Sequence, residues 1–187
     1  MSILPITLYG DNILRKKVSK AKSIDDKTIA LISNMFETMH NAHGIGLAAN
    51  QVGANKAIFI VDLTGVEEYE NFKPIVFINP NINKYSDEKC IIEEGCLSIP
   101  DIRGEVERPS EIEITYFDTN FKEQTIHADK LLARVIQHEY DHLRGIYFTD
   151  LLPAGEQKRL KKSLTKIKNR KIEVDYPITH DLDYQLK

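Results

Sequence analysis

The sequence predicts one domain that combines α-helices with β-strands. Its 187 residues fit a single domain, because domains of soluble proteins usually contain about 100–200 residues. Three segments space their apolar residues as amphipathic helices do, and several short runs are rich in β-branched and aromatic residues. Hydrophobic residues make up 42% of the chain and charged residues 28%, which argues against a disordered, collagenous or membrane-spanning chain.

The first predicted helix runs from Ser23 to about His43-Gly44. Ser23 stands three residues before Asp26 in a capping-box pattern, and glycine commonly ends a helix. The apolar residues between these ends repeat at intervals of one, three and four, as on one face of a helix: Leu31, Ile32, Met35, Phe36 and Met39.

Four short segments are predicted as strands, because they are rich in β-branched and aromatic residues or alternate apolar with polar residues: residues 57–61, 75–78, 111–116 and 121–126. The acidic residues 63–73 form a predicted loop, and Asn79-Pro80 closes the second strand. Residues 118–120 read as a turn, so the last two strands form a predicted hairpin.

Two more helices are predicted, over residues 129–143 and 155–168. The first has an apolar face and a glycine stop at Gly145; its apolar residues are Leu131, Leu132, Val135, Ile136 and Leu143. The second has a narrow apolar face on a surface of mostly lysine and arginine; its apolar residues are Leu160, Leu164 and Ile167. The domain is therefore expected to cover residues 1–170, followed by an acidic, loosely ordered tail at 171–187.

Charge and cysteine content narrow the classes of function. The net charge of −3 and the pI of about 6.1 argue against a surface that binds DNA or RNA as a whole. The first residues lack a positively charged leader, and no apolar run approaches the ~18 residues of a membrane helix. We expect a cytoplasmic protein that does not enter a membrane, and its two cysteines are then reduced.

The strongest functional signal is the pattern H-E-x-x-H, spelled by His138-Glu139-Tyr140-Asp141-His142 inside the second predicted helix. Residues four apart lie above one another on one helix face, so both imidazoles can bind one metal ion. Glu139 lies beside them, where a carboxylate can handle protons. The pattern therefore predicts a metal centre.

A catalytic metal site needs a third protein ligand and an open position. One metalloprotease class has a histidine six residues after the second one, where this chain has Phe148. A thermolysin-like site needs a downstream glutamate, and only Glu156 and Glu173 follow, in or after the basic segment. Cys96 is the better candidate because a thiolate is a strong ligand for zinc and iron, although a plain buried cysteine is the other reading. Cys90 lacks a comparable context and is expected to be structural.

A segment of small residues follows the first helix: Gly44-Ile45-Gly46-Leu47-Ala48-Ala49-Asn50-Gln51. Its spacing differs from that of a dinucleotide fingerprint, and no lysine follows as in a phosphate-binding loop. Small residues allow another group to approach the backbone closely. Two readings stay open, namely tight packing of a loop against a sheet, or a substrate wall in which Gln51 offers its amide to a carbonyl oxygen.

These three segments together resemble the peptide deformylase family. With φ for an apolar residue, the family shows G-φ-G-φ-A-A-x-Q, E-G-C-φ-S and Q-H-E-x-D-H-φ-x-G. The chain has all three motifs in this order, at residues 44–51, 94–98 and 137–145, and no defining position departs from them. The likeness covers about residues 1–150.

The resemblance implies a compact α+β fold in which antiparallel strands pack around the helix with His138 and His142. The N-terminal helix and the C-terminal basic helix flank this centre. The implied reaction removes the formyl group from the N-terminal formylmethionine of nascent polypeptides. Cys96, His138 and His142 would hold one divalent metal ion, with water in the fourth position. In this family the ion is commonly Fe²⁺, and Zn²⁺ or Ni²⁺ can occupy the same site.

The remaining implied roles follow from the chemistry of this reaction. A divalent metal lowers the pKa of its bound water to about 7, and the resulting hydroxide attacks the formyl carbon. The Gln51 side chain and the backbone N–H of Leu97 would stabilise the oxyanion. Glu139 would take the proton from the water and pass it to the leaving amine.

The substrate is expected to bind along Gly46, Gln51 and Leu97, with the formyl group near Gly46. The methionine side chain needs an apolar pocket, for which four positions are candidates: Ile45, Ile92, Leu131 and Val135.

Basic residues crowd the last predicted helix and its end: Lys158, Arg159, Lys161, Lys162, Lys166, Lys168, Arg170 and Lys171. The resemblance to deformylases with a C-terminal helix implies that residues 156–171 dock on the ribosome, and a solvated helix face is the other reading. Two alternative functions stay open for the chain as a whole. One is a zincin-like metallopeptidase, and the other is an inactive, metal-bearing module that binds the ribosome.

Overall fold

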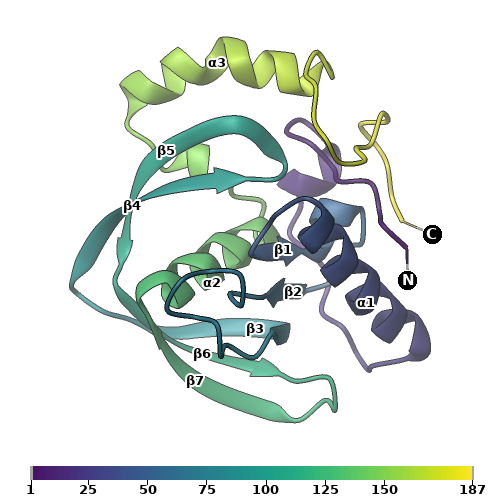
Figure 1. Ribbon diagram of the computed structural model, residues 1–187, viewed down its shortest axis with the longest axis vertical. Coiled ribbons are helices and arrows are strands. Elements are labelled where there is room, and N and C mark those ends of the chain that lie inside the picture. Colours follow the sequence, from purple (N-terminus) through teal and green to yellow (C-terminus); the bar gives the residue numbers. More distant parts are fainter. Residues whose placement is uncertain (1, 187) are drawn as a thin grey trace.

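The structure is a computed structural model that describes residues 2–186, in which two antiparallel sheets and three α-helices form one domain (Figure 1). The helices are α1 (Asp26–Asn41), α2 (Lys130–Leu143) and α3 (Ala154–Lys168). The strands are β1 (Gly46–Ala48), β2 (Ile58–Val61), β3 (Ile75–Tyr85), β4 (Lys89–Cys96), β5 (Ile99–Pro109), β6 (Glu111–Phe117) and β7 (Glu123–Asp129). Short 3-10 helices cover Asn12–Arg15, Ala49–Val52 and Phe148–Asp150.

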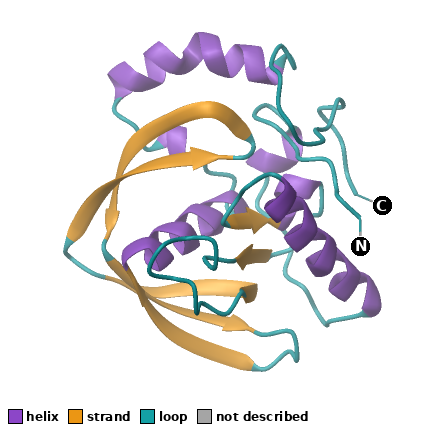
Figure 2. Cartoon of the chain, in the orientation of Figure 1, coloured by secondary structure: helices purple, strands orange, loops and turns teal. Residues whose placement is uncertain are grey.

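Helix α2 lies between the two sheets (Figure 2). The larger sheet has the strand order β1-β2-β3-β6-β7, and β4 and β5 form a separate two-stranded sheet. The apolar face of α2 packs on the larger sheet in one buried cluster that includes Phe59, Phe77, Ile114, Val135 and Ile136. This arrangement confirms the α+β fold with a central helix. None of the helices in the described part has the length and apolar character needed to cross a membrane.

The first helix begins two residues later than its capping-box pattern predicted. Asp25, not Ser23, is the N-cap, and its carboxylate accepts hydrogen bonds from the backbone N–H of Thr28 at 2.8 Å and from the Thr28 hydroxyl at 2.6 Å. An aspartate at this position satisfies N–H groups that the first turn leaves free. The predicted end near His43 is confirmed within two residues, because the helix ends at Asn41.

The second predicted strand does not stop at Asn79-Pro80. Strand β3 continues to Tyr85, and its pairing with β6 shifts register between Ile78 and Asn81. Asn79 has a left-handed backbone (φ 50°), and its side chain bonds both the N–H and the carbonyl of Ala21 at 2.8 Å. The Asn-Pro pair therefore makes a bulge inside a strand, which is one of the places that tolerate proline in a sheet.

Strands β4 and β5 were absent from the sequence prediction. Alternate residues of β5 are buried, but charged residues, glycine and proline interrupt the apolar pattern. Cys96 pairs with Ile99, so a two-residue turn at Leu97-Ser98 joins the strands. Gly104 is required where β5 passes Leu152, since a Cβ there would lie 2.8 Å from the leucine side chain. This hairpin brings Cys96 to α2.

The acidic tail after α3 was expected to be loosely ordered, and it is instead held against the N-terminal arm (Figure 1). Ile178 forms a parallel bridge with Ile6. Arg170 pairs with the buried Asp11, which also accepts a hydrogen bond from the Thr179 hydroxyl at 2.7 Å. The tail contacts the N-terminal arm mostly through backbone groups and through one aspartate far away in the sequence. The composition of the tail therefore could not predict this packing.

Candidate metal centre

Three predicted metal ligands meet between α2 and the β4–β5 hairpin. His138 and His142 lie one turn apart on α2, with ring centroids 5.0 Å apart. Cys96 ends β4, and its Sγ lies 3.1 Å from Nε2 of His142. The ligand atoms of the three residues all lie within 4.8 Å of one another. The structure therefore brings Cys96 next to two histidines that follow it by 42 and 46 positions in the sequence.

Glu94 orients one of these histidines, a role that the sequence analysis did not assign. Its Oε2 lies 2.8 Å from Nδ1 of His138, which leaves Nε2 of that ring free to face Cys96. Arg108 and Arg134 both donate to Glu94, at 2.6 and 2.8 Å. Burial alone would raise the pKa of Glu94, but its bonds to His138 and Arg108 outweigh burial and hold this pKa well below its usual range. A carboxylate behind a ligating histidine fixes the ring and makes it a better ligand.

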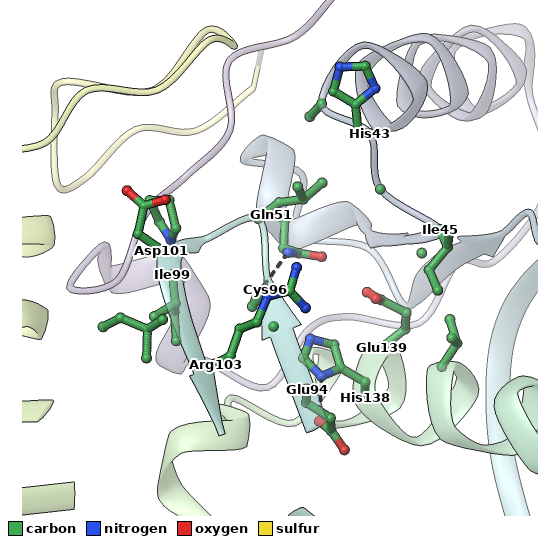
Figure 3. Close-up of a pocket in the computed structure, with 18 of the residues that line it drawn as sticks. His43, Ile45, Gln51, Glu94, Cys96, Ile99, Asp101, Arg103, His138 and Glu139 are labelled. Atoms are coloured by element: carbon green, nitrogen blue, oxygen red, sulfur yellow. Dashed lines mark hydrogen bonds and ion pairs between the residues drawn. The ribbon is translucent and has the colours of Figure 1, made fainter. Parts of the chain in front are cut away.

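Glu139 points into the same cleft and is 4% exposed (Figure 3). Its Oε2 has no hydrogen-bond partner among the described residues. Burial raises the pKa of Glu139 to about 7, and the neighbouring His138 charge opposes this rise. Gly46 lies directly against the carboxylate, because a Cβ there would sit 2.6 Å from Oε1. A carboxyl group poised near neutral pH beside a metal-ligand cluster can both take up and release a proton.

Gln51 reaches the cluster from the 3-10 helix at Ala49–Val52. Its Oε1 accepts from the Ala48 N–H at 2.8 Å, which fixes the amide so that Nε2 faces Ser98 Oγ at 3.1 Å and Cys96 Sγ at 3.6 Å (Figure 3). Asn50 ties the same segment to α2 by donating to the His142 carbonyl at 2.6 Å. The segment of residues 44–51 packs tightly against α2, and part of it also lines the cleft. Its contact with substrate stays a prediction.

The cleft has a volume of about 700 Å³. The residues predicted to bind substrate all line it: Ile45, Gly46, Gln51, Ile92, Leu97, Leu131 and Val135. Cys96, His138 and Glu139 lie at its inner wall. The lining combines apolar side chains with polar and charged ones, so the cleft can bind an apolar group beside a polar peptide end.

The residues present fit a metal ion. A thiolate and two imidazoles are a donor set that suits zinc and iron, and the structure turns all three toward one point. The buried charges behind them are compensated, because Glu94 is paired with two arginines. The cluster could therefore hold a divalent ion while leaving a position open toward the cleft.

A cysteine and two histidines beside a buried glutamate, at the end of a peptide-sized cleft, define a metal-dependent hydrolase. The family model described as polypeptide deformylase matches residues 3–158, and the chain belongs to this family. Members of the family are metal-dependent, and the activity of the chain is removal of the formyl group from the N-terminal methionine of nascent polypeptides.

Relatives and solved structures agree with this assignment. Peptide deformylase from Prosthecochloris aestuarii is 47% identical over 176 residues, which is 94% of each chain. That from Chlorobium phaeobacteroides is 45% identical over 185 residues, 99% of this chain and all of the relative. The Ehrlichia chaffeensis enzyme in complex with actinonin has a TM-score of 0.82 at 36% identity, covering 92% of this chain and 100% of that one. A mutant of Arabidopsis thaliana peptide deformylase 1B has a TM-score of 0.84 at 35% identity, and the match covers 90% of this chain and 91% of that one. These matches do not favour the metallopeptidase or the inactive module.

Proposed function

We propose that Cys96, His138 and His142 hold the catalytic metal and that Glu139 carries the proton of the deformylation reaction. The observation that carries this proposal is a buried oxygen of Glu139 that finds no hydrogen-bond partner within residues 2–186 and belongs to a side chain that lines the same cleft as Cys96 and His138. A buried oxygen without a partner is costly in a folded protein, which supports a partner supplied by water or substrate.

The residues of this chain supply the rest of the chemistry. A divalent ion bound there would act as a Lewis acid that polarises the formyl carbonyl and lowers the pKa of a bound water. Glu139 would take up a proton from the attacking water and deliver it to the departing amine. The Nε2 of Gln51 and the N–H of Leu97 donate hydrogen bonds to the oxygen that becomes negative, and each such donor is typically worth ~2.7–4 kcal/mol.

The proposed substrate pocket follows from the apolar residues among those that line the cleft. We infer that Ile45, Ile92, Leu131 and Val135 contact the methionine side chain, because they surround the same cavity as Glu139. Glu139 and Val135 lie so close to Gly46 that even a Cβ there would meet them at 2.6 and 2.8 Å, so this part of the cleft is crowded. This crowding supports selection of formyl over the larger acetyl group.

Formate release tests the reaction and the role of Glu139 together. The substrate is a formyl-Met-Ala-Ser peptide and the enzyme is purified without oxygen and loaded with Fe²⁺. We expect Glu139→Ala to retain its metal and lose most turnover, while Glu105→Ala, which removes an exposed carboxylate on β5, keeps the wild-type rate. Near wild-type turnover in metal-loaded Glu139→Ala would contradict the role of Glu139.

We propose Fe²⁺ as the native ion, with Zn²⁺ or Ni²⁺ able to replace it. A ferrous site with a thiolate ligand is sensitive to oxidation, so activity should be lost in air and kept when Ni²⁺ or Zn²⁺ replaces iron. Cys96→Ser should lower metal retention after dialysis, because a hydroxyl is a poorer ligand than a thiolate. Cys90→Ser is the matched control, and equal metal loss in both variants would contradict the assignment of Cys96.

We further propose that α3 docks the enzyme on the ribosome, in the cytoplasm where nascent chains emerge. The lysines of α3 are exposed, which supports contact with a polyanion such as ribosomal RNA. A charge reversal tests this better than a deletion, since the tail packs against the N-terminal arm. Ribosome co-sedimentation should be lost on changing three exposed lysines of α3 to glutamate: Lys158, Lys161 and Lys162. It should persist when the same change is made at three exposed lysines before and within α1: Lys20, Lys22 and Lys27.

A further inference from the structure

The C-terminal tail contributes a wall to the cleft. Residues 173–176 line the same cavity as the ligand cluster. This stretch is anchored at both ends, by the pairing of Arg170 with the buried Asp11 on one side and by the bridge between Ile178 and Ile6 on the other. Two anchors so close in sequence fix the place of the stretch between them.

Within this wall, Tyr176 contacts the turn that joins β4 to β5. Its hydroxyl donates to the backbone carbonyl of Leu97 at 2.8 Å. The next residue of the turn, Ser98, is held from two other segments: its carbonyl accepts from the N–H of Tyr9 at 2.8 Å, and its Oγ accepts from Gln51 Nε2 at 3.1 Å. The turn is thus fixed by hydrogen bonds from the N-terminal arm, from the segment of small residues at 44–51 and from the tail.

This turn holds two groups whose position matters for the reaction. Leu97 directly follows the ligand Cys96 and supplies the proposed oxyanion donor, and it lies outside the paired register of β4 and β5. A two-residue turn without ladder bonds depends on its neighbours for its orientation. Small displacements of reacting or stabilising groups lower the reaction rate strongly. The hydrogen bond from Tyr176 can therefore affect the rate although Tyr176 is not a proposed metal ligand.

We propose that Tyr176 is a positioning residue for deformylation. By holding the Leu97 carbonyl it fixes the peptide group that follows Leu97, which limits rotation of the Leu97 backbone and so orients the preceding peptide group, whose N–H meets the developing oxyanion. This inference rests on the proposed function of the cleft. Burial raises the pKa of Tyr176, with smaller contributions from the nearby Cys96 and Asp101. The hydroxyl therefore stays protonated, and remains a donor, at the pH at which the enzyme works.

The test is Tyr176→Phe, which removes one hydroxyl and keeps the ring. Tyr184→Phe is the matched control, because Tyr184 lies in the same tail, packs against Gly53 and donates no side-chain hydrogen bond among the described residues. We expect Tyr176→Phe to lower kcat about three- to tenfold, the range of one ordinary hydrogen bond. KM and the metal content should stay within about twofold of the wild type, and hydrogen exchange at the Leu97 amide should become faster.

Each other outcome has a definite meaning. Failure of the wild type to release formate would refute the proposed function itself, whereas the hydrogen exchange measurement still tests the contact of Tyr176 with Leu97. Unchanged kcat in Tyr176→Phe would overturn the positioning role. So would a loss of kcat matched by an equal loss of bound metal, or an equal loss in Tyr184→Phe, because either result would show general packing of the tail.

Discussion

Gly46→Ala should disable the enzyme through a single methyl group. The backbone of Gly46 is ordinary strand, paired with Val61, so alanine meets no conformational obstacle there. Its Cβ would lie 2.6 Å from Oε1 of Glu139 and 2.8 Å from Cγ1 of Val135. Ordinary contacts begin near 3.4 Å, so the carboxylate must retreat by about 0.8 Å. A misplacement of about 1 Å costs roughly 100-fold in rate, and we expect kcat to fall by about this factor.

Steady-state formate release measures this loss, and metal content shows whether the ligand cluster survives. Gly65→Ala is the control, because nothing lies within 4 Å of the Cβ it would add. The metal content of Gly46→Ala should match the wild type, since the three atoms nearest to the added Cβ belong to Glu139 and Val135 and not to a proposed ligand. A kcat within threefold of the wild type would refute the argument that the position of Glu139 limits the reaction. A loss of metal in proportion to activity would refute the steric route through Glu139.

Two further predictions concern buried charges. Burial raises the pKa of Glu139 to about 7. Because the proposed proton acceptor becomes protonated as the pH falls, kcat/KM should decrease below about pH 7. A bound metal ion favours the carboxylate and therefore shifts this decrease to lower pH. A flat profile between about pH 8 and 5 would contradict the proton-transfer role. Glu94→Gln leaves the buried Arg108 and Arg134 undercompensated, and breaking such a group typically costs ~3–5 kcal/mol in the free energy of unfolding. Urea unfolding measures this cost, and Glu93→Gln, at an exposed neighbour, should change it little.

The parts of the molecule that follow a local pattern were predictable from the sequence. Helix α2 and its H-E-x-x-H pattern depend only on the spacing of residues within four positions, and helical geometry then places both imidazoles on one face. The same holds for α1, α3 and the β6–β7 hairpin. The proposed third ligand was inferred from chemistry and resemblance rather than from spacing, because Cys96 lies 42 positions before His138.

The parts that depend on distant pairing were not predictable in this way. Strand β5 alternates buried and exposed residues, but its buried set includes Gly104 and Arg108, and no hydrophobicity pattern marks a buried arginine. Arg108 is buried because Glu94 and Asp141 meet it there, at 2.6 and 2.7 Å. A charged residue becomes a core residue only through its partners, and those partners come from a second strand and a helix.

The same reasoning explains why the tail was misjudged and why it bears on the active site. Its acidic composition predicts solvation, yet the contacts that hold it are a bridge to Ile6 and a pairing of Arg170 with Asp11. Both partners belong to the first residues of the chain, so the place of the tail depends on the N-terminal arm. Once there, it sets Tyr176 on the turn behind Cys96. The two ends of the chain therefore both contact the turn that follows the proposed metal ligand and carries the proposed oxyanion donor.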